Sequence, residues 1–519
     1  MGGRHKQRRK GGHRKPPAPP FVPKPAPEKG VDELRRELAA APAMEQDRLK
    51  PVPLHSLKAV LLDKLKHVPL PVHATAAILT FLTILAVPEF VPRLKDYKIF
   101  DWRTAPAVID FVPRRATESP VEEEQKRLRP DADPASYAVR PLDDSSGAME
   151  RFYEALRRVE ANEAGAQVQI LHYGDSPTTA DLITADTRVA LQKQFGDAGH
   201  GFCLIAKPWA WYEHRGVSLT GGGWKIEPAT QSQSRDGLFG LGGVSFRGMP
   251  GAWSRVVLRD TGHTAVEVSY LEMPGGGSFH LAIGDQVVSV DTSGPQTGPG
   301  YAQFPVPPGE RRFEIRVTEG AVRLFGYRFE KPGPGLAYHS LGVNGAYVAV
   351  PSRMFREEHW AAQLRHYTPA LVVINYGTNE SVYPSFVDQG FASELKEVIR
   401  RVRAAVPEAS VLVMSPMDRG EREASGEIGT VPALPRVVAI EQRVAQEAGC
   451  AFFNTFQAMG GLGTMGRWYQ AEPRLVSADF IHPMPAGARI VGNLFSKALV
   501  DGYNKYKLER MRENVARRD

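Results

Sequence analysis

Apolar runs that end in polar turns alternate with amphipathic stretches along the second half of the chain. Four short apolar runs predict strands, at residues 167–173, 370–376, 410–414 and 450–454. Apolar residues three and four positions apart predict helices at 148–159, 391–406, 437–448 and 488–500. This alternation predicts an α/β fold, in which helices cover both faces of a parallel sheet and chemistry lies beyond the carboxyl ends of its strands.

The segment 216–335 interrupts this alternation. It holds 23 of the 49 glycines in 120 of the 519 residues, which is about twice its share and unlike a helical segment. Alternating apolar and polar positions predict strands at 254–258, 264–270, 279–290 and 312–317. We therefore expect an inserted all-β domain, interpreted as a small sandwich. Its large aromatic residues either pack in a core or stack on sugar rings: Trp224, Phe239, Phe246, Trp253, Tyr301, Phe325 and Tyr327.

One apolar run lies far from these strands and helices. Leu70 to Val87 contains no charged residue over 18 positions, and as a helix it would reach about 27 Å, close to the thickness of a bilayer core. We expect a transmembrane signal-anchor at 68–90; the alternative is a buried helix of a soluble domain. The run begins too deep in the chain for an ordinary cleaved signal. The Pro-rich, charged stretch 91–145 is interpreted as a linker.

Charge is distributed unevenly along the chain. Residues 1–67 carry 16 Lys and Arg against 7 Asp and Glu, a net +9, so the remaining residues carry 49 against 51, a net −2. We interpret 1–67 as a disordered, solvated cytoplasmic tail; binding to nucleic acid or anionic lipid is the alternative, and no nucleic acid partner is expected. Four basic residues flank the apolar run within 20 positions on each side, so only this tail favours a cytoplasmic N-terminus and an exported body, periplasmic or extracellular.

Two polar motifs follow directly after predicted strands. Ser176, in Gly174-Asp175-Ser176, is placed at a strand's carboxyl end with backbone N–H groups of the next helix nearby, as a nucleophile requires. Asn379, in Gly377-Thr378-Asn379, is positioned either to donate a hydrogen bond to developing negative charge or to cap a helix. Either motif taken alone is weak evidence for a catalytic site.

Two further motifs complete the set. In Gly342-Val343-Asn344-Gly345, a glycine allows a backbone N–H to approach an oxyanion, although an ordinary turn is the alternative. Asp479 and His482, three residues apart before the last helix, offer a general base and a carboxylate that orients it. A metal-binding pair and a surface histidine are the alternatives for these two residues.

The four motifs, in this order, resemble those of the SGNH (GDSL-type) hydrolase superfamily. The resemblance covers roughly residues 148–200 and 337–505, and implies a flavodoxin-like three-layer SGNH domain at 146–215 and 336–519, interrupted by the β domain. It implies that Ser176 is the nucleophile, His482 the base and Asp479 the acid that orients it. The N–H groups of Ser176 and Gly345 and the side chain of Asn379 would form the oxyanion hole; Gly345 is preferred to Gly342, and the sequence leaves that choice open.

A narrower likeness is to bacterial peptidoglycan O-acetylesterases. It rests on Gly-Thr-Asn-Glu at 377–380, on the run 195–201 (FGDAGHG) and on the β insertion. Those enzymes usually have His after the motif serine, where this chain has Pro177.

These observations predict a membrane-anchored serine esterase that removes O-acetyl groups from envelope carbohydrate. An O-acetyltransferase with the same triad and a non-catalytic glycan-binding scaffold are the alternatives. The expected partners are an O-acetylated carbohydrate and the membrane, and this chemistry requires neither a metal nor an organic cofactor. The oligomeric state is left open.

Overall fold

The computed structural model describes residues 141–231 and 236–516. The predicted tail, the predicted membrane anchor and residues 91–140 of the predicted linker lie outside the described residues. Within the described ranges, no helix combines the length and the apolar content needed to cross a membrane.

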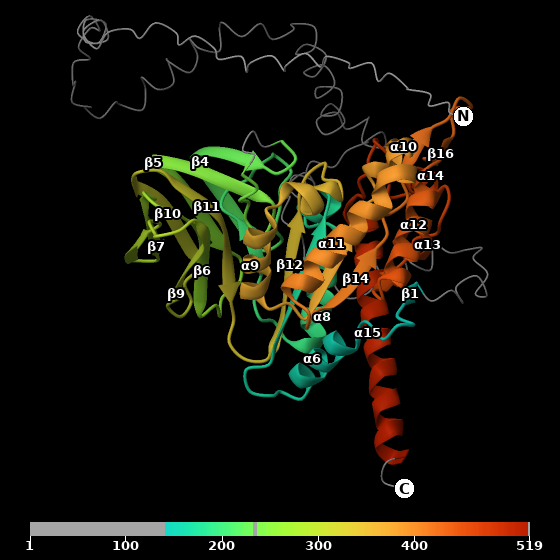
Figure 1. Ribbon diagram of the computed structural model, residues 1–519, viewed down its shortest axis with the longest axis horizontal. Helices are drawn as coiled ribbons and strands as arrows, with labels where there is room; N and C mark the ends of the chain where they lie inside the picture. The colour runs from blue at the N-terminus through green and yellow to red at the C-terminus, as the bar shows by residue number, and fades with distance from the viewer. Residues whose placement is uncertain (1–140, 232–235, 517–519) are drawn as a thin grey trace, which may run out of the picture. The chain divides into compact units, whose positions relative to one another are not determined.

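A six-stranded sheet forms the centre of the α/β part (Figure 1). Its strands, in spatial order, are β1 (Leu142–Asp143), β17 (Ala451–Phe453), β14 (Ser410–Met414), β13 (Leu371–Asn375), β2 (Gln167–Gly174) and β12 (Gly335–Gly342). The last five run parallel, and the short β1 pairs antiparallel with β17. Numbered in chain order, the parallel strands lie 2-1-3-4-5, which is the flavodoxin-like arrangement.

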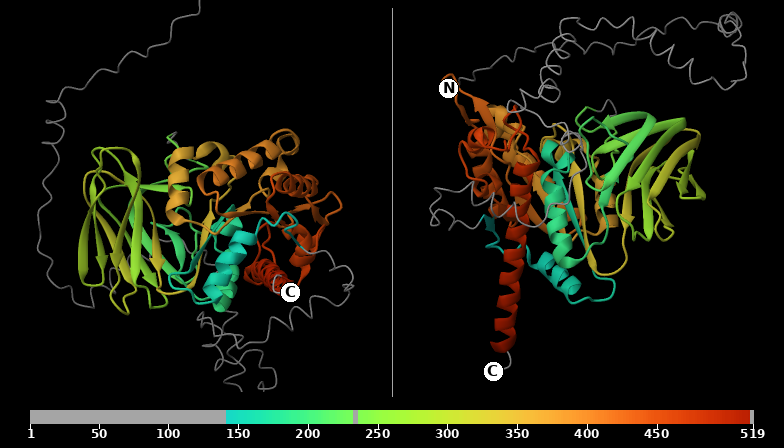
Figure 2. Two further views of the ribbon diagram at one scale, coloured as in Figure 1. Left: turned by 60° about the horizontal axis from the view of Figure 1, so that its bottom comes forward. Right: turned by 180° about the vertical axis from the view of Figure 1, so that it is seen from behind.

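Helices cover both faces of this sheet (Figure 2). The first face is covered by α6 (Glu150–Glu160), α8 (Ile183–Phe195) and α15 (Pro485–Ala516), and the second by α9 (Glu357–Tyr367), α11 (Ala392–Ala405) and α12 (Leu434–Glu447). Alternate residues of a strand enter different cores: Val373 packs with the first helices and Val372 with the second. Because both faces are buried, the central strands are continuously apolar, which explains why the sequence predicted them.

Short elements connect these layers. They are α7 (Ser176–Thr179), α10 (Pro384–Phe386), α13 (Thr455–Ala458), α14 (Thr464–Gln470), the 3-10 helix η4 (Glu380–Val382), the π-helical turns η3 (Val350–Met354) and η5 (Val387–Phe391), and the hairpin β15 (Gly420–Arg422) and β16 (Ile428–Thr430). In the α/β part, the four predicted strands and the four predicted helices are observed to within a few residues, except that α15 continues well beyond residue 500. In the inserted region, the predicted strand 279–290 is observed as two strands, Ser278–Ile283 and Gln286–Asp291, and 254–258 is the end of a strand that begins at Val244.

The inserted region forms one antiparallel sheet, and the expectation of a two-sheet sandwich was wrong in that respect. Its nine strands are β3 (Gly201–Leu204), β4 (Val217–Pro228), β5 (Val244–Leu258), β6 (Ala265–Glu272), β7 (Ser278–Ile283), β8 (Gln286–Asp291), β9 (Gly298–Pro305), β10 (Arg312–Glu319) and β11 (Val322–Glu330). On one edge, the long strand β5 pairs first with β11 and then with β10. A strand that changes partner turns a corner, so the sheet stays continuous and curves into a nearly closed barrel.

The aromatic residues of the β region are mainly structural. Phe239, Phe246, Phe325 and Tyr327 are buried, as expected for a core. Tyr301, on β9, stacks on His366 of α9 with ring centroids 3.5 Å apart, and His366 Nε2 lies 2.8 Å from Glu267 Oε2 on β6. Tyr301 therefore helps to hold the β region against the α/β part.

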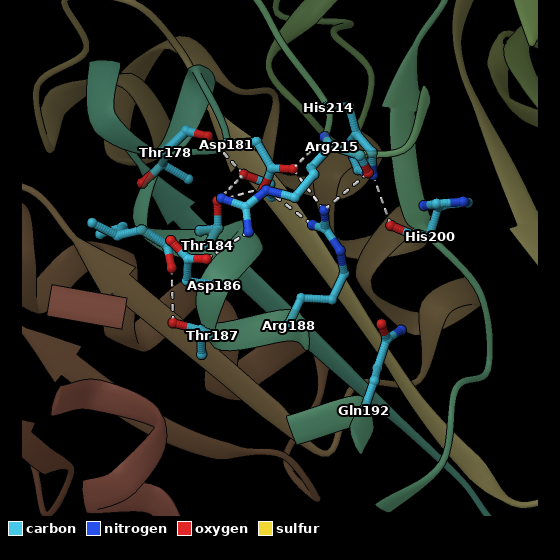
Figure 3. A network of polar contacts seen from close by, with 12 residues as sticks. Thr178, Asp181, Thr184, Asp186, Thr187, Arg188, Gln192, His200, His214 and Arg215 are labelled. Carbon is cyan, nitrogen blue, oxygen red and sulfur yellow. Dashed lines mark hydrogen bonds and ion pairs between the residues drawn. The ribbon is translucent and has the colours of Figure 1, made fainter. Parts of the chain in front are cut away.

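A buried ion pair fixes the chain just after the predicted nucleophile (Figure 3). Arg188 Nη1 and Nη2 donate to Asp181 Oδ1 and Oδ2 at 3.1 and 2.6 Å, and their side chains are 3% and 1% exposed. Asp181 also accepts from Thr184 Oγ1 and from the backbone N–H of Arg215. Burial raises the pKa of Asp181, but the charge of Arg188 and these hydrogen bonds lower it to about 2. The carboxylate therefore stays ionised and holds the turn between α7 and α8.

Replacing Arg188 should destabilise the protein strongly. Arg188→Leu leaves the Asp181 carboxylate buried without its counter-charge, so the free energy of unfolding should fall by about 3–5 kcal/mol. Urea denaturation of the full chain, followed by Trp fluorescence, measures this change. Arg158→Leu is the matched control because Arg158 is 54% exposed in its ion pair with Glu163 and should cost under about 1 kcal/mol. Equal losses in the two variants would contradict the role given to Asp181.

Candidate active site

The predicted nucleophile lies at the point where the strand order of the sheet reverses. Ser176 begins α7 just after β2. In the sheet, β2 lies between β12 and β13, so the next two strands of this sheet along the chain pair with opposite sides of β2. Loops diverge at such a point and leave room for a ligand at the carboxyl ends of the strands. Ser176 is 7% exposed, and Pro177 occupies the first turn of α7, where a missing N–H is tolerated.

The structure brings Ser176, His482 and Asp479 together. His482 Nε2 lies 2.7 Å from Ser176 Oγ, and His482 Nδ1 lies 2.6 Å from Asp479 Oδ2. With a proton on Nδ1, held by the carboxylate, Nε2 is free to accept the proton of the serine hydroxyl. Both ring nitrogens of His482 thus have partners within the three residues, which does not fit the alternative of a metal-binding pair.

Asp479 holds its own loop as well as the imidazole. Its Oδ1 accepts hydrogen bonds from the backbone N–H groups of Ile481 at 2.9 Å and His482 at 3.1 Å, and from Ser477 Oγ. Burial raises the pKa of Asp479, but the hydrogen bonds from Ser477, His482 and the backbone outweigh it and bring the pKa to about 2. The carboxylate is therefore ionised at neutral pH and able to stabilise an imidazolium.

The two candidate glycines have different surroundings. Gly342 ends β12 against α7, and a Cβ there would lie 2.1 Å from the backbone N of Thr179, so packing alone requires glycine. Gly345 has a φ of +68°, and no atom outside its chain neighbours lies within 4 Å of where its Cβ would be. The open surroundings of Gly345 suit a donor that must meet a substrate oxygen.

Asn379 lies beside the Gly345 loop. It occupies the N-cap position of η4, but its side chain makes no capping hydrogen bond. Instead its Nδ2 donates to the backbone O of Ala346 at 2.9 Å. An amide nitrogen carries two hydrogens, so this bond orients the group and leaves a second N–H for a ligand.

Glu380 ties together the two loops that carry these donors. Its side chain is fully buried, and its Oε1 accepts from the backbone N–H of Val348 at 2.6 Å while Oε2 accepts from that of Gly377 at 3.0 Å. Val348 lies three residues after Gly345, and Gly377 two residues before Asn379. Glu380 therefore acts as a positioning residue for both donor loops.

Two more buried carboxyl groups lie near Glu380. Burial raises the pKa of Asp175 to about 6 and that of Glu380 to about 7, and it raises the pKa of Glu441 well above its ordinary value. Arg419 lies near Asp175; its Nη1 donates to the backbone O of Thr378 at 2.8 Å, and its charge, like that of His482, lowers the pKa of Asp175. Three buried carboxyl groups with raised pKa values thus interact with one another beside Ser176.

Sequence analysis did not assign roles to Glu380 and Arg419. Glu380 stands in the quoted Gly-Thr-Asn-Glu motif, and its place in that motif was the available signal. Arg419 follows the strand at 410–414 by five residues, and nothing in its local sequence distinguishes it from a surface arginine.

Glu380→Gln should change how stability depends on pH. A carboxyl with a raised pKa binds its proton more tightly in the folded chain, so between about pH 4.5 and 7 the folded state holds more protons and the free energy of unfolding falls as pH rises. Glutamine cannot titrate. The stability advantage of the wild type over the variant should therefore shrink across this window, by an amount on the order of 3 kcal/mol.

Urea denaturation at a series of pH values measures this difference. Glu150→Gln, on the exposed surface of α6, is the control for the loss of one negative charge. A wild-type advantage that stays constant from pH 4.5 to 7 would show that the Glu380 carboxyl does not titrate there.

Comparisons with known proteins agree with this architecture. Residues 308–490 match the model of the GDSL-like lipase/acylhydrolase family, a stretch that includes Asn379, Asp479 and His482 but not Ser176. A solved structure described as "Peptidoglycan O-acetylesterase in action, 5 min" superposes with a TM-score of 0.61 at 23% identity, over 70% of this chain and 99% of that one. None of the curated proteins matches.

A family two carbohydrate esterase from Clostridium thermocellum, solved in complex with cellohexaose, has a TM-score of 0.23 at 12% identity, over 55% of this chain and 100% of that one. The match of residues 308–490 to the GDSL-like lipase/acylhydrolase family model agrees with the flavodoxin-like sheet and with the contacts among Ser176, His482 and Asp479.

Proposed function

We propose that this chain is a serine esterase that removes O-acetyl groups from envelope carbohydrate, peptidoglycan or another polysaccharide. The observation that carries the proposal is the contact of 2.7 Å between Ser176 Oγ and His482 Nε2, continued by the contact of 2.6 Å between His482 Nδ1 and Asp479 Oδ2. A serine, an imidazole and a carboxylate in this chain of contacts form the machinery of acyl transfer.

The geometry supports a two-step reaction. Ser176 Oγ attacks the ester carbonyl while His482 Nε2 takes the hydroxyl proton, and the imidazolium then gives this proton to the sugar oxygen as the C–O bond breaks, so the sugar leaves with a free hydroxyl. Water next attacks the acyl-enzyme with His482 again as the base, which releases acetate and restores the serine. The N–H groups of Ser176 and Gly345 and the amide of Asn379 would stabilise the oxyanion in both steps.

The choice of an acetylated carbohydrate rests on similarity of architecture. The solved structure described as a peptidoglycan O-acetylesterase shares the fold over most of this chain. The small acyl group also fits a nucleophile that is only slightly exposed at the end of a strand. Membrane attachment through residues 68–90, with the catalytic body on the periplasmic or extracellular side, completes the proposal and rests on the sequence pattern alone.

Ser176→Ala should abolish hydrolysis of p-nitrophenyl acetate and acetate release from acetylated envelope polysaccharide. The variant removes the attacking oxygen and leaves the packing of α7 unchanged. Ser393→Ala, at an exposed serine of α11, is the matched control and should retain full activity. Wild-type turnover by the Ser176→Ala protein would refute the mechanism. Acetyl transfer to added oligosaccharide in place of acetate release would favour an acetyltransferase.

Asn379→Ala should lower kcat by about 10²–10³, because one oxyanion donor is lost while substrate binding in the ground state is largely kept. Steady-state kinetics on the same esters measures the effect. Asn504→Ala, at an exposed position of α15, is the control and should leave kcat unchanged. An unchanged kcat in Asn379→Ala would remove this side chain from the oxyanion hole.

A further inference from the structure

Three potential metal ligands meet at the place where the chain passes between the α/β part and the β region. His200 precedes β3, and Asp260 and His263 lie in the turn between β5 and β6; we refer to them as the junction cluster. One ligand atom from each of the three lies within 4.8 Å of the others. Figure 3 shows His200 next to His214, whose Nε2 is 2.9 Å from the backbone O of His200.

His263 provides an independent sign that a ligand is missing. Its side chain is buried, with the residue 2% exposed, yet neither ring nitrogen has a hydrogen-bond partner among residues 141–231 and 236–516. A buried polar group without a partner costs about 1–3 kcal/mol, so native structures usually satisfy it.

We propose that His200, Asp260 and His263 bind one divalent transition-metal ion of the zinc type. Two imidazoles and one carboxylate are ligands that zinc accepts, and a water would occupy the fourth tetrahedral position. Asp260 has a side chain 38% exposed, which gives an ion and this water access from solvent.

The present geometry is close to that of a bound site. His200 Nε2 lies 2.6 Å from Asp260 Oδ1, and the rings of His200 and His263 lie 5.4 Å apart with an interplanar angle of 16°. Ligands at about 2.0–2.2 Å from a tetrahedral zinc lie roughly 3.3 Å from each other. Side-chain rotations that move the ligand atoms by about an ångström would therefore form the site, with the proton of His200 on Nδ1 so that Nε2 is free to bind the ion.

Charges around the cluster favour a cation. Lys331 Nζ donates to Asp260 Oδ2 and to Asp197 Oδ2, so one ammonium faces two carboxylates. Lys331 binds Oδ2 of Asp260, and Oδ1 is the oxygen that contacts His200. Lys331 would therefore orient the carboxylate without binding the ion itself.

Such an ion would tie the first connection between the two parts of the chain to the turn between β5 and β6, and Lys331 links that turn to the second connection. Asp197 and His200 lie on the first connection, from α8 to β3, and Lys331 lies on the second, from β11 to β12. Its binding free energy would stabilise the folded arrangement of the β region on the α/β part. This role is separate from the proposed ester hydrolysis, since none of the cluster's residues belongs to the Ser176 site.

Zinc binding to the metal-free full chain tests the proposal. After treatment with a chelator, titration with Zn²⁺ alone should show one tight site per chain and a rise in Tm. His263→Gln should weaken that site by about 10²-fold or more, since even outer partners of metal sites cost 10–100-fold. His280→Gln, at an exposed histidine of β7, is the matched control and should bind like the wild type.

A second variant and a spectroscopic measurement complete the test. Circular dichroism and esterase activity check that each variant folds. If His263→Gln does not fold, Asp260→Asn takes its place and should show the same loss of Zn²⁺ affinity of about 10²-fold or more. Co²⁺ bound to the wild type should give the visible absorption of a four-coordinate ion. Equal Zn²⁺ affinity and stoichiometry in the wild type and both variants, or no tight binding by the wild type, would overturn the proposal whatever the outcome for Ser176.

Discussion

The site depends on the close meeting of three parallel strands at their carboxyl ends. β12 and β13 flank β2, and the backbone of Gly342 at the end of β12 packs directly on α7, which begins with Ser176. No side chain fits between them. This contact brings the Gly345 loop next to Ser176, and the hydrogen bond from Asn379 to Ala346 brings the loop after β13 to the same place. Backbone packing, together with this one side-chain hydrogen bond, therefore brings the loops of the site together.

The same edge of the sheet carries groups that oppose stability. Asp175, Glu380 and Glu441 are buried carboxyl groups whose pKa values are all raised, and burial is the main cause. Glu380 is retained in this setting because it accepts a backbone N–H from each donor loop, which apolar residues cannot do. Functional sites commonly carry such a cost where geometry matters more than local stability.

The β region is part of the hydrophobic core, and it is attached by more than its two connections. One continuous cluster of buried side chains contains Phe202 and Tyr327 of the β region together with Tyr173 and Tyr367 of the α/β part. At the same boundary, Tyr301 stacks on His366, and His366 Nε2 contacts Glu267 Oε2. The junction cluster lies where the chain crosses this boundary twice, so an ion there would reinforce an interface that apolar packing has already formed.

The sequence alone determined the strands, the helices and the residues able to do the chemistry, because buried parallel strands are continuously apolar and polar residues follow them at their ends. Ser176 and Asn379 were singled out in this way, whereas Asp479 and His482 were singled out as a pair that precedes the last helix. Local pattern does not report which strand pairs with which, so the single continuous β sheet was missed, and with it the switch of β5 between β11 and β10. Local pattern does not report burial either. The contacts of Glu380 join two loops that are distant in the chain, and the Asp181–Arg188 pair and His263 are enclosed by several elements. Only the tertiary structure decides these contacts and this enclosure.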